Sequence, residues 1–225
     1  MASDQTSPDD SMIPPPQTPP NTVLQNRVAG AAIAAASLAS VFLMLHHPRP
    51  SGAIDTESFN QATRHLHGLD PVHASFIAII GMLVFGFMGF ADQLGPRKPL
   101  VRAGLIAYLL GAFAMLNALM ASTMSANQNF AVTGVIATSV AMLLWSVALM
   151  HQRGAPRLVG TFGLLTSAGP GVMLLLHGAL GASVATGSGA IIAHMPLNVM
   201  GMTVVVVIQS IWNLVIATML LRGRI

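Results

Sequence analysis

The side chains in this sequence that are best suited to chemistry are its eight histidines. Imidazole titrates near neutral pH and is the commonest metal ligand in proteins. Five histidines lie near the ends of hydrophobic segments and form the candidate metal site: His65, His67, His73, His177 and His194. Imidazole with methionine and without cysteine suits copper, whereas zinc accepts imidazole and carboxylate alone. The alternative is that these amphipathic, mostly neutral side chains simply lie at a membrane surface.

Other kinds of chemistry find less support in the sequence. Asp70 is a further metal ligand or a carboxylate that orients an imidazole, but it also fits the N-cap of a helix starting at Pro71, which we favour. A haem between helices needs two facing histidines inside the membrane, and only His177 is deep enough. The chain has no cysteine and no nucleotide-binding, serine-hydrolase or zinc-protease motif, so no catalytic residue is predicted.

A second polar feature is a stripe of amides in the last hydrophobic segment, made by Asn198, Gln209 and Asn213. At about 100° per residue, the three side chains fall within about a quarter turn of one another. Amides that face lipid are costly, so we expect this stripe to face the interior of a bundle or a partner subunit. It predicts either hydrogen bonds between helices or the lining of a ligand or quinone cavity.

The elements that position these residues follow from the composition. Of the 225 residues, 53% are hydrophobic and 8% are charged, and the mean hydropathy is +0.69. Soluble domains carry roughly 25% charged residues. This composition excludes a soluble enzyme, a nucleic-acid-binding module and a disordered protein, and it predicts a membrane protein.

Six apolar segments are long enough, or nearly so, to cross a bilayer as helices, at about 28–45, 72–91, 100–122, 130–150, 158–181 and 197–221. The predicted fold is therefore all-α, a multi-pass membrane bundle of six transmembrane helices in residues 27–225. Residues 1–26 are polar and rich in proline, which predicts a disordered tail. The long loop 46–71 is predicted to hold a short interfacial helix, and the turn 182–196 is rich in Gly, Ser and Ala.

The orientation follows from the basic residues. Eight of the ten lie on the side that holds both termini, namely Arg27, Arg97, Lys98, Arg102, Arg153, Arg157, Arg222 and Arg224. The positive-inside rule then predicts that both termini are cytoplasmic. Seven of the eight histidines fall on the opposite, outer face, and only His151 is predicted to be cytoplasmic. The preference for arginine over lysine, with abundant alanine and glycine, favours a bacterial inner membrane protein.

Two predicted hairpins have a weak sequence echo at a spacing of 59 residues. The matched positions are Gln93, Gly95, Lys98, Gly104 and Leu105 with Gln152, Gly154, Arg157, Gly163 and Leu164. Either the hairpins are related by duplication, or two glycine-rich membrane turns match by chance. Glycines at helical spacing, such as Gly104 and Gly163, also predict close contacts between helices or, for the fifth helix, a homodimer.

Two functions remain open from the sequence. The first is an accessory or scaffold subunit of a larger membrane assembly, which binds the lipid bilayer and other membrane proteins and no nucleic acid. The second is a membrane protein that binds copper or zinc through its outer histidines. A small-molecule transporter is less favoured, because no acidic residue follows Asp92 to couple transport to an ion.

Overall fold

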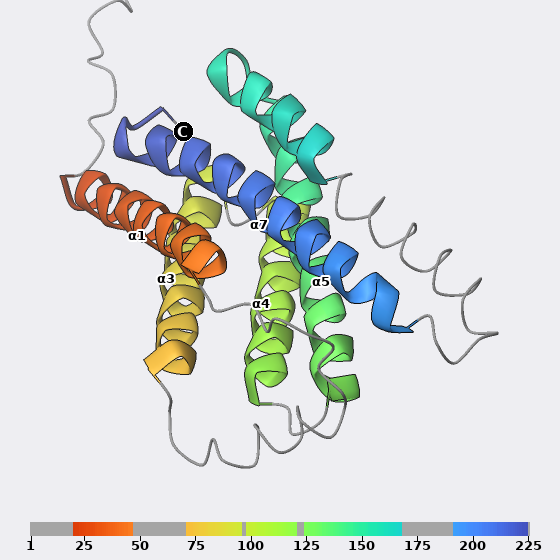
Figure 1. Cartoon of the computed structure of the whole chain (residues 1–225). Coiled ribbons are helices and arrows are strands. Elements are labelled where there is room, and N and C mark those ends of the chain that lie inside the picture. The colour runs from red at the N-terminus through yellow and green to blue at the C-terminus, as the bar shows by residue number, and fades with distance from the viewer. Residues whose placement is uncertain (1–19, 47–70, 96–97, 121–123, 168–190, 225) are drawn as a thin grey trace, which may run out of the picture.

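The computed structural model describes residues 20–46, 71–95, 98–120, 124–167 and 191–224, and within these ranges every regular element is a helix. The helices are α1 (Pro20–His46), α3 (Pro71–Leu94), α4 (Pro99–Met120), α5 (Met124–Met150) and α7 (Ile191–Leu221). A further helical segment covers 155–167 (Figure 1). The predicted all-α class is thereby confirmed.

Two helices begin earlier than the sequence pattern predicted. Helix α1 begins at Pro20 rather than Val28, so the residues 20–26 that were assigned to the tail are helical. Helix α7 begins at Ile191, and Pro196 lies inside it rather than at its start. The apolar pattern marks the part of a helix that lies in lipid, and it does not mark where the helical backbone ends. The predicted interfacial helix in 46–71 and the second half of the segment 158–181 lie outside the described residues.

Four of the described helices are long and apolar enough to cross a membrane, by length and composition: Val23–Leu43, Ala74–Leu94, Pro99–Met120 and Phe130–Met150. A shorter apolar stretch, Val206–Leu221, forms the last part of α7. In lipid every backbone group must find its partner inside the protein, and continuous helices meet this demand. The chain thus has the character of a multi-pass membrane protein.

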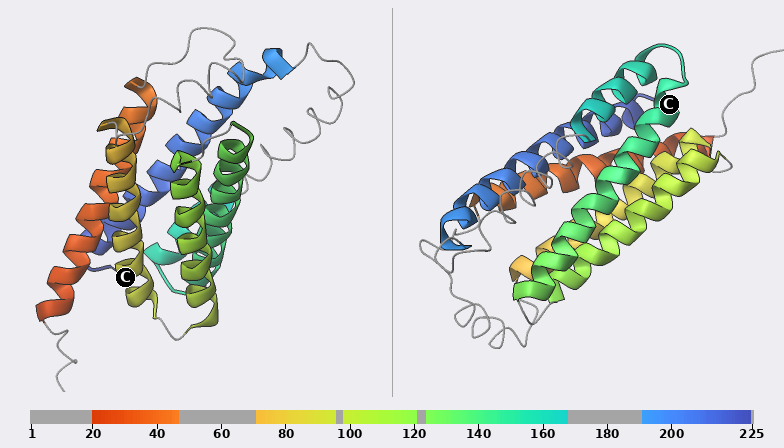
Figure 2. Two further views of the ribbon diagram at one scale, coloured as in Figure 1. Left: turned by 90° about the horizontal axis from the view of Figure 1, so that it is seen from below. Right: turned by 90° about the vertical axis from the view of Figure 1, so that its right-hand side faces the viewer.

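The helices form two layers that cross obliquely. Helices α3, α4 and α5 run side by side, and α1 and α7 pack together across them (Figures 1 and 2). The most extensive contact joins α4 to α5, and α1 contacts both α7 and α3. Because residues on α3, α4, α5 and α7 share one core, the centre of the bundle lies where the two layers meet.

Two tight turns at one end of the bundle are built alike. Gly95 follows α3 with φ +101° and Gly154 follows α5 with φ +81°, both in the region that favours glycine. The amide of Lys98 donates to the carbonyl of Gly95, and the amide of Arg157 donates to that of Gly154, both at 3.1 Å. The two matched glycines therefore share a positive φ and a carbonyl that accepts a hydrogen bond from the amide three residues later.

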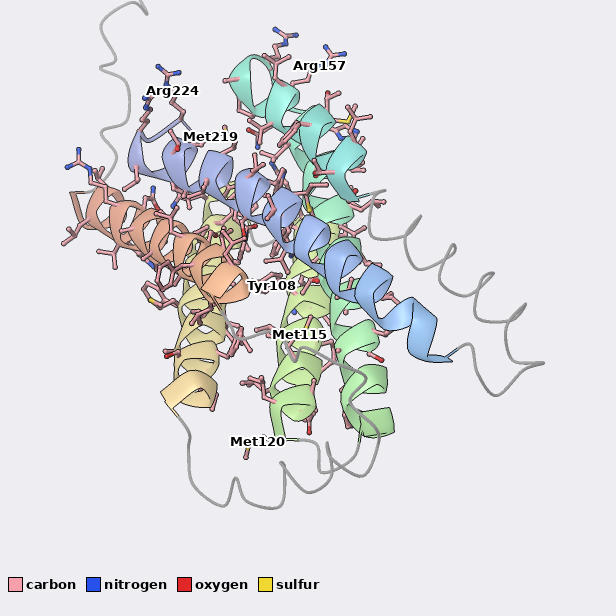
Figure 3. The ribbon with its side chains drawn as sticks, viewed as in Figure 1. Tyr108, Met115, Met120, Arg157, Met219 and Arg224 are labelled. Carbon is pink, nitrogen blue, oxygen red and sulfur yellow. The ribbon has the colours of Figure 1, made fainter. Side chains whose placement is uncertain are left out.

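All the charged side chains in the described ranges lie at the end of the bundle that holds these turns. They are the single acid Asp92 and the basic residues Arg27, Lys98, Arg102, Arg153, Arg157, Arg222 and Arg224. Figure 3 shows Arg157 and Arg224 at this end and Met120 at the other. We call this the charged end of the bundle.

Candidate functional site

The five candidate metal ligands lie in parts of the chain where their side chains are not described. His65, His67 and His177 are outside the described residues, and only the backbone of His73 and His194 is placed, near the starts of α3 and α7. Within the described ranges, no group of three or more His, Asp or Glu side chains is placed to hold a metal ion. The copper or zinc site therefore stays a prediction.

The amide stripe of α7 is described in its second half. Asn213 is 4% exposed, Gln209 is half-buried, and the side chain of Asn198 lies outside the described residues. The Oδ1 atom of Asn213 is buried and finds no hydrogen-bond partner in the described part of the chain. Asn213 therefore places an amide inside the bundle without the interhelical bond that its oxygen would need.

The centre of the bundle is filled by a cluster of five rings, which we call the ring cluster: Phe87, Phe90, Tyr108, Trp145 and Trp212. Phe87 stacks on both indoles, at a centroid distance of 5.1 Å from Trp145 and 6.0 Å from Trp212, with interplanar angles of 14° and 12°. Phe90 meets both indoles edge-on, at 90° and 89°. Each of these rings is at most 6% exposed, so the cluster joins four helices through aromatic contacts of favourable geometry.

The first indole, that of Trp145 on α5, is closely packed and its N–H group is hydrogen-bonded. A Cβ added to Gly104 of α4 would lie 2.6 Å from Nε1 of Trp145, so only a glycine lets the ring approach this closely. Nε1 donates a hydrogen bond of 3.2 Å to the carbonyl of Val101, one turn earlier on α4. The ring of Tyr108 lies 5.5 Å away, centroid to centroid. The indole of Trp145 is therefore both packed and hydrogen-bonded.

The second indole, that of Trp212 on α7, has a similar setting with one difference. It lies against Gly163 in the helical segment 155–167, where an added Cβ would collide with its Nε1 and with Oγ of Ser146. Neither Nε1 of Trp212 nor Oγ of Ser146 has a hydrogen-bond partner among the described residues. Because Gly163 packs inside the chain, this face of the helix is not free to join a second copy.

Most hydroxyls in the described spans have a local role only. Ser40, Thr138, Ser139, Thr161, Thr166, Ser167 and Thr218 each donate to a carbonyl three or four residues earlier in their own helix. Such bonds satisfy the hydroxyl and leave it no free proton to offer a ligand. The buried oxygens of Ser37 and Ser146, in contrast, have no hydrogen-bond partner among the described residues.

The charged end carries a groove of about 530 Å³ between α1, α3 and α7. We call it the basic groove, and its polar lining residues are Asn26, Arg27, Gln93, Arg222 and Arg224. It forms because α1 and α7 touch just beside it, where a Cβ on Gly30 would lie 2.9 Å from the carbonyl oxygen of Ala217. Arginine residues from the ends of α1 and α7 thus line one groove.

The C-terminal end of α7 fixes one wall of this groove. Gly223, with φ +60°, donates its amide to the carbonyl of Leu220, and Arg224 donates its amide to that of Met219. These two bonds form a Schellman motif, which satisfies the last carbonyls of the helix. The backbone of Arg224 is thereby turned back over the end of α7.

Comparison with protein-family models, with curated proteins and with solved structures finds no match to this chain. The interpretation of the ring cluster and the basic groove therefore depends on their geometry. Sequence reasoning missed both, because it used Arg27, Arg222 and Arg224 only to set the orientation. The hairpin echo was the available signal for the ring cluster, since each of its matched glycines, Gly104 and Gly163, lies against one indole.

Proposed function

We propose that this chain is an integral membrane accessory or scaffold subunit, which binds other membrane proteins through its apolar outer faces. The observation that carries the proposal is the ring cluster. Five rings from α3, α4, α5 and α7 fill the space where the two layers meet, so the centre of the described bundle is packed rather than hollow. A substrate path through this centre would have to displace stacked side chains, which disfavours transport.

The outer faces offer the surface that a scaffold needs. On α4 the side chains of Ile106, Leu110 and Phe113 are 55%, 60% and 64% exposed, and on the segment 155–167 Leu165 is 72% exposed. These side chains contact lipid or a neighbouring membrane protein. Association of helices in lipid is driven by van der Waals packing and hydrogen bonds, and not by a hydrophobic difference between lipid and protein.

The test is photo-crosslinking inside native membranes. A photoreactive residue at Leu110, Phe113 or Leu165 is expected to join the chain to a discrete membrane protein of constant mass. The same residue at Phe90, which is fully buried, is the matched control and is expected to give no such product. Adducts to lipid alone at all three exposed positions would refute the scaffold role.

The proposal includes six spans in the bacterial inner membrane with both termini in the cytoplasm. The gathering of the described charges at one end of the bundle supports this orientation, because basic residues favour the cytoplasmic side. A cytoplasm-dependent reporter fused after Ile225 is expected to be active, and one inserted in 121–123 is expected to be inactive. The reverse result would overturn the orientation.

A further inference from the structure

The basic groove has a charge pattern that the scaffold role does not use. Arg27 comes from α1, whereas Arg222 and Arg224 follow α7, and the three line one groove. Among the described residues that line it, none is a carboxylate, and Asp92 lies beside the groove residue Gln93 without lining it. Three arginines that line one groove, with no carboxylate among the described lining residues, favour the binding of an anion.

A second feature of the groove is independent of charge. Asn26 lines the groove beside the arginines and is 8% exposed. Amides that are largely removed from water are usually hydrogen-bonded in natural structures. A ligand oxygen in the groove would accept a hydrogen bond from this amide.

We propose that the basic groove binds the phosphate of an acidic phospholipid headgroup. The three arginines pair with the phosphate oxygens, and the amides of Asn26 and Gln93 donate to the remaining acceptors. Arginine is the side chain whose planar fork best matches phosphate, and basic pockets between helices at the membrane surface suit such headgroups.

The rim of the groove favours a lipid over free phosphate. Val23 and Leu221 both line the groove and are 42% and 41% exposed, which provides apolar surface next to the arginines. A phospholipid places a phosphate and hydrocarbon side by side, as the groove does. Inorganic phosphate would use the arginines and leave this apolar rim in contact with water.

Close contacts between helices also fix the shape of the groove in the absence of a ligand. Gly30 lets α1 approach the backbone of α7, and on α1's other side an added Cβ on Gly86 would lie 2.9 Å from the carbonyl oxygen of Ala29. With the Schellman motif holding Arg224, little ordering is needed on binding. Such pre-organisation favours binding because fewer degrees of freedom are lost.

The experiment measures lipid retained by the purified full-length chain in a neutral detergent, by native mass spectrometry. Phosphatidylglycerol, phosphatidylcholine, glycerol phosphate and inorganic phosphate are offered separately. We expect one phosphatidylglycerol to be retained per chain and phosphatidylcholine to be lost. Equal retention of the two lipids would overturn the proposal. Displacement of phosphatidylglycerol by equimolar inorganic phosphate would overturn the assignment to a lipid.

A pair of double variants with the same loss of charge separates the groove from general attraction. The R222Q/R224Q chain is expected to bind phosphatidylglycerol about 100-fold more weakly, since each lost charge-assisted hydrogen bond to the phosphate contributes about tenfold. The control chain R153Q/R157Q loses two arginines that are exposed at the same end and do not line the groove. It is expected to bind normally, and equal losses in both chains would refute a specific site.

The variant Asn26→Leu tests the amide separately from charge. It keeps the approximate volume of the side chain and removes its hydrogen-bonding groups, and the melting temperature of the lipid-free chain is measured alongside to check that the fold is retained. Its affinity for phosphatidylglycerol is expected to fall severalfold. Unchanged affinity would show that Asn26 does not contact the lipid. This outcome, like the loss of charge specificity, would leave the scaffold role unaffected, because the crosslinking test uses different surfaces.

Discussion

The two tryptophans occupy comparable positions with different hydrogen bonding. Each indole lies against a glycine of a neighbouring helix, Gly104 for Trp145 and Gly163 for Trp212, and each stacks on Phe87. Nε1 of Trp145 donates to the carbonyl of Val101, whereas Nε1 of Trp212 has no partner in the described chain. The two glycines thus give both indoles room to approach, but only one of the two indole N–H groups has a hydrogen-bond acceptor in the described chain.

This difference shows that the close packing of an indole and the hydrogen bond of its N–H depend on different residues in this bundle. A glycine determines how closely an indole approaches, because it removes the Cβ that would collide with the ring. The hydrogen-bond partner of Nε1 depends on which polar atoms of the neighbouring helix lie within reach. Beside Trp212 that neighbour is Ser146, whose hydroxyl is itself unpaired. The first indole site is therefore expected to be the more stable of the two.

The largest effect is expected from a substitution that breaks both sites together. Phe87→Ala removes the ring that stacks on both indoles and leaves a cavity at the centre of the bundle. We expect a loss of about 3–5 kcal/mol in the free energy of unfolding. Denaturation in mixed micelles measures it. The exposed Phe85→Ala is the matched control, and an equal loss in both variants would contradict a central role for the ring cluster.

A smaller effect is expected from filling either glycine. Gly104→Ala and Gly163→Ala each drive a methyl group into an indole, and we expect each to lower the free energy of unfolding by about 1–3 kcal/mol. Gly81→Ala is the control, because a Cβ added at Gly81 would have no other atom within 4 Å. It is expected to be neutral or stabilising, because alanine favours a helix.

Combining each glycine variant with Ser146→Ala distinguishes the packing of the two indole sites. Oγ of Ser146 is one of the atoms that an added Cβ on Gly163 would meet, whereas the nearest atoms to Gly104 all belong to Trp145. The second substitution is expected to recover part of the stability of Gly163→Ala and none of that of Gly104→Ala. Recovery in both, measured by the same denaturation, would show that the two sites are not packed as described.

The smallest effect distinguishes the two indoles by their hydrogen bonds. Trp145→Phe and Trp212→Phe remove similar volume, but only the first loses a hydrogen bond, and the second removes a buried N–H without a partner. We expect Trp145→Phe to cost about 1 kcal/mol more in the free energy of unfolding. If the two variants lose equal stability, the hydrogen bond to Val101 contributes nothing.

The features that sequence predicted best are those that depend on one segment at a time. Apolar runs indicated the helices, and Gly95 and Gly154, which the sequence echo had paired, both lie at positive φ directly after α3 and α5. The pattern was wrong about where α1 and α7 begin, since helical backbone extends beyond the apolar run into residues such as Asn26. That extension is what brings Asn26 and Arg27 to the basic groove.

The membrane character, the all-helical class and the gathering of basic residues on one side could be predicted from the amino-acid sequence alone. These follow from hydropathy and from charge, which are properties of residues taken in order. The folded chain alone reveals that Phe87 joins two indoles, that Asn213 and Asn26 are buried, and that arginines from both ends of the sequence share one groove. In lipid all apolar faces are equally acceptable to the solvent, so the partner of each face is chosen by the close fit of side chains from different helices.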